Sequence, residues 1–120
     1  MRTSMLNLVV SLAFALVATE AFAHAKLVKA TPPVGGTVAS PSEIRIEFSE
    51  GIEPKFTGLT LTSASGATVP VGAAKTEAGN AAVLIVPIAK PLAPGVYTVR
   101  WHAVSVDTHH TQGNFEFTVQ

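Results

Sequence analysis

The chain has 120 residues, with eight Lys or Arg against eight Asp or Glu, and it contains no cysteine. This length suits one domain, and the balanced charge argues against nucleic acid as a partner, which would require a basic surface. Without cysteine there are neither disulfides nor thiolate metal ligands, so a packed core alone must stabilise the fold.

The N-terminal segment has the pattern of an export signal. Arg2 provides a positive charge, residues 8–18 are almost entirely apolar, and Ala21-Phe22-Ala23 has the small residues of a cleavage site. The apolar run is shorter than the roughly 20 residues that a membrane-spanning helix needs. We therefore expect a signal peptide at 1–23, cleaved after Ala23, and a periplasmic protein that has no membrane span once it is cleaved.

The mature domain would then run from His24 to Gln120, and an uncleaved membrane anchor is the alternative. Both methionines, Met1 and Met5, lie in the signal, so the mature chain has no thioether ligand either. Any transition-metal site in it has to be built from nitrogen and oxygen atoms.

The mature chain reads as short strands separated by Gly, Pro and Ser. Apolar and polar residues alternate with a period of two in several of them, and Pro70 restricts one to the edge of a sheet. The expected strands are 26–30, 44–48, 59–62, 68–71, 82–86, 96–104 and 114–119.

Seven short strands without helical periodicity predict an all-β fold, a Greek-key β-sandwich or small barrel. Tyr97 follows a Gly-containing turn at the entrance to a late strand, which is the position of a tyrosine corner. On the same strand, Trp101 lies on the same side as Tyr97 and is expected in the core.

The sequence offers little for catalysis. Neither G-x-S-x-G nor S-x-x-K occurs, so an activated serine is not indicated. Glu50 and Asp107 could form the carboxylate pair of a glycosidase, but a sugar groove is hard to build on so few residues. We expect no catalytic residues and no enzymatic activity.

A short polar run near the C-terminus has metal-ligand character. Asp107 and His109 are two residues apart, so in an extended segment their side chains would point to the same side. This makes half of a metal site. The alternative is a polar loop between the last two strands, in which Asp107 serves the turn.

His24 adds the other half. Cleavage after Ala23 would give it a free α-amine, and this amine and imidazole Nδ1 can chelate one metal ion together. With the imidazole of His109 and an oxygen of Asp107, the set has three nitrogens and one oxygen. A tetragonal N,O site of this kind favours Cu(II), whereas Zn(II) prefers a tetrahedron.

Four motifs stand in order along the chain: His24-Ala25-Lys26-Leu27-Val28, Thr31-Pro32-Pro33, Phe48-Ser49-Glu50, and the run Trp101-His102-Ala103-Val104-Ser105-Val106-Asp107-Thr108-His109. Their order and spacing resemble those of the CopC family of small periplasmic copper-binding proteins. The resemblance extends over the whole mature chain and implies a cupredoxin-like or immunoglobulin-like barrel.

The resemblance also implies one Cu(II) per chain, bound by the amine and Nδ1 of His24, by His109 and by Asp107, with Glu50 close by. For Glu50 we favour a role in orienting the amine or offering a weak oxygen. The implied function is copper sequestration, carriage or resistance. The implied partner is a CopD-like inner-membrane protein or another periplasmic copper protein.

Some family members bind Cu(I) in a Met-rich loop, but here the corresponding residues 61–71 contain neither Met nor His, so a protein specific for Cu(II) is expected. His102 and His110 are not expected to be ligands. Two other functions stay open: a copper monooxygenase with a histidine brace, and a metal-independent exported interaction module.

Overall fold

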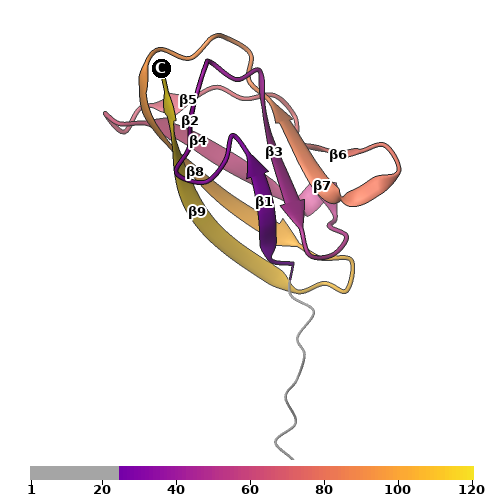
Figure 1. Cartoon of the computed structure of the whole chain (residues 1–120). Coiled ribbons are helices and arrows are strands. Elements are labelled where there is room, and N and C mark those ends of the chain that lie inside the picture. Colours follow the sequence, from indigo (N-terminus) through magenta and orange to yellow (C-terminus); the bar gives the residue numbers. More distant parts are fainter. Residues whose placement is uncertain (1–24) are drawn as a thin grey trace, which may run out of the picture.

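The computed structural model describes residues 25–120, which form two packed β-sheets (Figure 1). The strands are β1 (Leu27–Thr31), β2 (Thr37–Val38), β3 (Glu43–Phe48), β4 (Gly58–Ser63), β5 (Thr68–Val69), β6 (Lys75–Glu77), β7 (Asn80–Pro87), β8 (Gly95–Val104) and β9 (His110–Val119), with a 3-10 turn η1 at Pro54–Phe56. No helix in this part of the chain is long and apolar enough to cross a membrane.

The four-stranded sheet has the order β1-β3-β7-β6, and the five-stranded sheet has the order β2-β9-β8-β4-β5. All pairings are antiparallel except that of β2 with β9, which is parallel. The expected all-β sandwich is therefore confirmed. The short strand before Pro70, β5, lies at a sheet edge as expected.

The structure adds two strands that the hydrophobic pattern did not predict, β2 and β6, and it begins β9 at His110 instead of residue 114. β2 has only two residues, and β6 is polar and mostly lies at the surface, so neither shows alternation. The first half of β9 places Thr111 and Gly113 at its inward positions, and regular burial begins only at Phe115.

Aromatic side chains fill the space between the sheets. The hydroxyl of Tyr97 donates a hydrogen bond to the carbonyl of Ala93 at 2.7 Å, which confirms the tyrosine corner. Trp101 is 9% exposed and packs edge-on against Phe48 of the opposite sheet, with ring centroids 5.2 Å apart. The expected place of Trp101 in the core is confirmed.

Gly113 of β9 lies opposite Trp101 of β8, and the indole covers its backbone. A Cβ atom at this position would lie 2.7 Å from Cζ2 of Trp101, which is closer than van der Waals contact allows. The glycine therefore makes room for the only tryptophan in the chain.

We expect Gly113→Ala to lower the free energy of unfolding by about 1–3 kcal/mol, because the methyl group overpacks the core. Urea unfolding followed by Trp101 fluorescence measures this. Gly58→Ala is the matched control: its Cβ would meet the His102 ring at an ordinary 3.4 Å. Equal unfolding midpoints for the two variants would show that the indole does not require a glycine.

Candidate metal site

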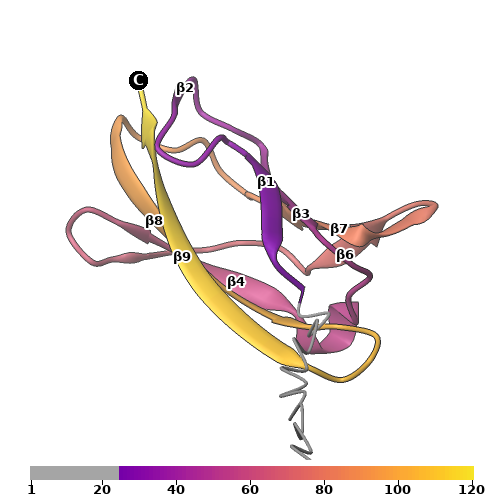
Figure 2. The same ribbon diagram turned by 60° about the horizontal axis from the view of Figure 1, so that its bottom comes forward.

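Three segments that are distant in sequence meet at one end of the sandwich: the start of β1, the residues after β3, and the loop between β8 and β9 (Figures 1 and 2). Lys26 and Ser49 join the first two, through Ser49 N–H to the Lys26 carbonyl at 2.8 Å and Lys26 N–H to Ser49 Oγ at 2.9 Å.

The segment after β3 continues toward the other sheet and pairs with the end of β8. Ile52 forms an antiparallel bridge with Ser105, and Val106 N–H donates to the Gly51 carbonyl at 3.1 Å. Glu50 directly precedes Gly51, and Asp107 directly follows Val106, so the backbone of both residues lies at this junction.

The β8–β9 loop is closed by backbone hydrogen bonds. Ser105 N–H donates to the carbonyl of His109 at 2.9 Å, and Thr108 N–H donates to the carbonyl of Ser105 at 2.8 Å. Thr108 has φ of +72°, which is unusual for a β-branched residue. The expected extended conformation from Asp107 to His109 is therefore wrong, because the segment makes a tight turn.

The turn brings Asp107 and His109 into contact. His109 Nδ1 lies 3.0 Å from Asp107 Oδ2. In an extended strand, residues two apart are separated by roughly 6.6 Å along the chain, at about 3.3 Å each. The turn therefore achieves the pairing that the sequence suggested, but through a different backbone conformation.

The carboxylate of Asp107 is held from two sides. Ser105 Oγ donates a short hydrogen bond to Oδ1, and His109 contributes both its ring Nδ1–H and a longer backbone N–H contact at 3.4 Å. These hydrogen bonds lower the pKa of Asp107 to about 2; the bond from Ser105 has the larger effect, and the bond from His109 the smaller one. The group is therefore ionised throughout the neutral range.

Glu50 contributes a buried acceptor. Its Oε1 atom is buried and has no hydrogen-bond partner among residues 25–120. A buried carboxylate oxygen without a partner is costly, so its position favours a nearby cation or hydrogen-bond donor. This is the kind of polar atom that a metal ion or an ammonium group would satisfy.

The start of the domain is anchored beside the loop. Ala25 is fully buried, and its carbonyl accepts a hydrogen bond from Thr111 Oγ1 at 2.8 Å. His24, the fourth predicted ligand, lies outside the described residues. It directly precedes Ala25 in the chain.

The other two described histidines differ in their surroundings. The His102 ring packs over Gly58 of β4, and His110 begins β9 opposite Val104, is exposed, and lines a hollow with Ala25 and Trp101. Within residues 25–120, no three His, Asp or Glu side chains gather closely enough to hold a metal ion alone. A complete site there needs at least one further ligand.

Sequence reasoning missed Ser105, which is fully buried and contacts Asp107. The signal was present in the alternation of β8. Tyr97, Val99, Trp101 and Ala103 are alternate buried positions, and Ser105 continues this series with a hydroxyl in place of an apolar group, although Val104 is buried as well.

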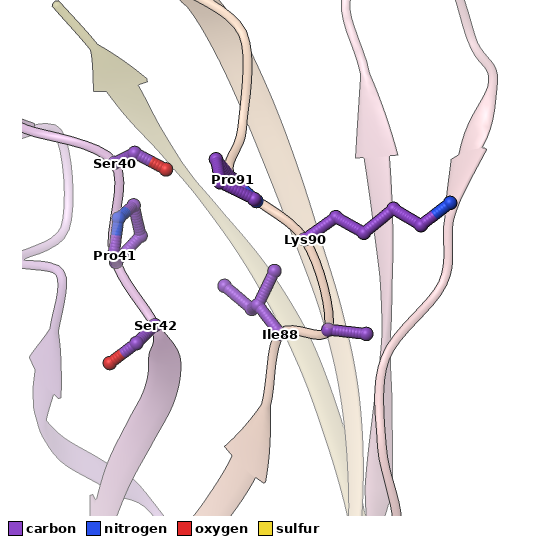
Figure 3. Close-up of a pocket in the computed structure, with 7 residues that line it drawn as sticks. Ser40, Pro41, Ser42, Ile88, Lys90 and Pro91 are labelled. Carbon is purple, nitrogen blue, oxygen red and sulfur yellow. The ribbon is translucent and has the colours of Figure 1, made fainter.

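A separate hollow lies at the opposite end of β3 (Figure 3). It is lined by Ser40, Pro41, Ser42, Ile88, Ala89, Lys90 and Pro91. The ammonium of Lys90 points away from the other labelled side chains, and no His, Asp or Glu lines the hollow. This region therefore lacks the ligands that a metal site needs.

A family model described as the CopC domain matches residues 27–120. The chain belongs to the CopC family. It is 41% identical to Protein YobA of Escherichia coli K12 over 106 residues, covering 88% of this chain and 86% of YobA. It is 37% identical to copper resistance protein C of Xanthomonas campestris pv. juglandis, covering 98% of this chain and 96% of the relative.

The solved structure of PcoC, described as a methionine-rich copper resistance protein from Escherichia coli, superposes with a TM-score of 0.74 and 34% identity. It covers 82% of this chain and all of PcoC. The resemblance inferred from the motifs is confirmed for the family and for the fold.

We expect the carboxyl group of Asp107 to titrate with a pKa of about 2 in the metal-free protein, below its ordinary 3.8. Because the folded-state pKa is lowered, this ionised group stabilises the fold fully above pH 3.8, and the contribution disappears as the pH falls through about 2. Asp107 is the only aspartate in the chain, so a selectively ¹³C-labelled carboxyl gives one signal to follow by NMR.

His109→Ala serves as the control, since it removes the smaller of the two side-chain hydrogen bonds and should raise the pKa of Asp107 only part of the way. A wild-type midpoint near 3.8 would contradict the hydrogen bonds described for this loop.

Proposed function

We propose that the exported protein, His24 to Gln120, binds one Cu(II) ion in the periplasm and sequesters or carries it. The observation that carries this proposal is the pair formed by Asp107 Oδ2 and His109 Nδ1, 3.0 Å apart beside the anchored start of the domain. The family supports copper as the metal, since its members include proteins named copper resistance protein C.

The spacing of this pair suits two ligands of one ion. Metal–nitrogen and metal–oxygen distances are about 2.0–2.2 Å, so two neighbouring ligands at right angles lie about 3 Å apart. Without metal, a hydrogen bond joins His109 Nδ1 to Asp107 Oδ2; with metal, the ion would replace the proton of this bond. Little rearrangement of the two side chains is then needed.

His24 would complete the ligand set. Ala25 is buried and bonded to Thr111, and Lys26 is bonded to Ser49, which supports a ligand role for the residue that precedes Ala25. After cleavage at Ala23, the amine and Nδ1 of His24 supply two nitrogens from one residue. Glu50, whose Oε1 is buried without a partner among the described residues, would balance the positive charge and orient the amine.

The types of ligand atom in the exported chain favour one oxidation state of copper. The exported chain offers nitrogen and oxygen but no sulfur, and a site with three nitrogens and one oxygen favours Cu(II) over softer Cu(I). PcoC is described as methionine-rich, whereas residues 61–71 of this chain have no Met or His. We therefore propose a Cu(II)-only carrier whose partner is a CopD-like membrane protein or another periplasmic copper protein.

Chelation by the α-amine of His24 can be tested by changing the residue at which the chain begins. Protein that begins at His24 should bind Cu(II) more than about 100-fold more tightly than protein that retains Ala23, because losing direct ligands should exceed the 10–100-fold cost of losing an outer partner. Competition with a chelator measures this affinity. Quenching of Trp101 reports binding, since Trp101 lines the same hollow as Ala25.

One extra residue after Gln120 is the matched control and should change nothing. If the forms that begin at His24 and at Ala23 had equal affinities, chelation by the amine would be ruled out.

The histidines can be separated by single substitutions. We expect His109→Ala to weaken Cu(II) binding by more than about 100-fold, because it removes a direct ligand and a partner of Asp107. The neighbouring His110→Ala should stay within about threefold of wild type, an energy of about 0.6 kcal/mol. Copper EPR should show the change in nitrogen ligands only for His109→Ala, and the reverse pattern would place the site on the exposed side of β9.

A further inference from the structure

The hydroxyl of Ser105 lies where the chemistry of the fold predicts an apolar group. β8 buries Val99, Trp101 and Ala103 on its inner side, and Ser105 follows them and is fully buried. A buried hydroxyl is unfavourable unless it is hydrogen-bonded. Its partners therefore explain what it does at this position.

Among residues 25–120, the side-chain hydrogen bonds of Ser105 lead to the candidate ligands. Oγ donates to Asp107 Oδ1 and accepts the backbone N–H of His109 at 3.3 Å. The same hydroxyl lies 3.3 Å from the carbonyl of His109. One rigid group thus touches the carboxylate of one ligand and the backbone of the other.

The consequence for Asp107 is geometric. A carboxylate on the surface can rotate about χ2, and this rotation exchanges the places of its two oxygens. The hydrogen bond from Ser105 to Oδ1 fixes that rotation, so Oδ2 is directed to Nδ1 of His109. The side chain of Asp107 is 41% exposed, so burial alone does not fix its orientation.

We propose that Ser105 is a positioning residue, whose buried hydroxyl holds Asp107 Oδ2 against His109 Nδ1 so that the two ligand atoms are in place before metal arrives. This inference rests on the proposed function for its effect on copper, but its structural part concerns the metal-free protein. A hydrogen bond at Nδ1 sets the tautomer of the imidazole, so the tautomer of His109 reports the pairing directly.

The test compares Ser105→Ala with a matched variant, Thr57→Val. Thr57, just before β4, also has a buried hydroxyl. It accepts the N–H of Val104, the residue before Ser105, at 3.0 Å, and among the described residues it has no hydrogen bond to Asp107 or His109. Both variants lose a buried hydroxyl beside the same strand end. Only one loses the contact to the ligands.

The protein is expressed with its own N-terminal segment and purified as the cell exports it. ¹⁵N NMR of the metal-free protein should show His109 protonated at Nδ1 in wild type and Thr57→Val, and a mixture of tautomers in Ser105→Ala. Cu(II) affinity should fall about tenfold or more in Ser105→Ala, as for the loss of other outer partners of metal ligands, and stay within about threefold of wild type in Thr57→Val.

An unchanged tautomer in Ser105→Ala would overturn the proposal, and so would an unchanged copper affinity in a variant whose tautomer has shifted. Equal losses of affinity in Ser105→Ala and Thr57→Val would also overturn it, since the effect would then come from general destabilisation. If wild type bound no Cu(II), the proposed function would fail, while the tautomer would still decide whether Ser105 positions Asp107.

Discussion

The candidate site depends on the junction where the chain leaves one sheet and pairs with the other. After β3, the segment at Gly51 and Ile52 bonds to Val106 and Ser105 at the end of β8. This junction closes one end of the sandwich, because it ties the backbone that follows Glu50 to the backbone that precedes Asp107. Together with the hydrogen bond from Thr111 to the Ala25 carbonyl, it fixes the loop after β8 relative to the first described residues of the domain.

Much of the fold was readable from the sequence, because its signals are local. Ile44, Ile46 and Phe48 alternate with polar residues, and all three are buried. Tyr97 could be recognised from a turn and one aromatic residue, and the structure supplies its hydrogen bond to Ala93. Periodicity of two along a strand translates directly into burial on one side.

The remainder depends on contacts between segments, which no local pattern records. β6 is polar because it lies at a sheet edge, and its pairing with β7 does not require apolar residues. The sequence indicated that Asp107 and His109 belong together, but an extended backbone was the wrong reason. Their contact requires a turn whose shape is set by hydrogen bonds from Ser105, a residue that carries no metal-ligand signal of its own.

The conformation of Thr108 shows how the loop is maintained. A β-branched residue at φ of +72° costs on the order of 1–3 kcal/mol, and each backbone hydrogen bond of the loop returns only about 0.5–1.5 kcal/mol. The two backbone bonds to Ser105 together with its hydroxyl contacts are enough to balance this cost. The strained residue stands between the two candidate ligands, and the Ser105 hydroxyl serves both sides: it accepts the backbone N–H of His109 in the turn and donates to the carboxylate of Asp107. Loss of this one hydroxyl would therefore weaken the turn and the ligand geometry together.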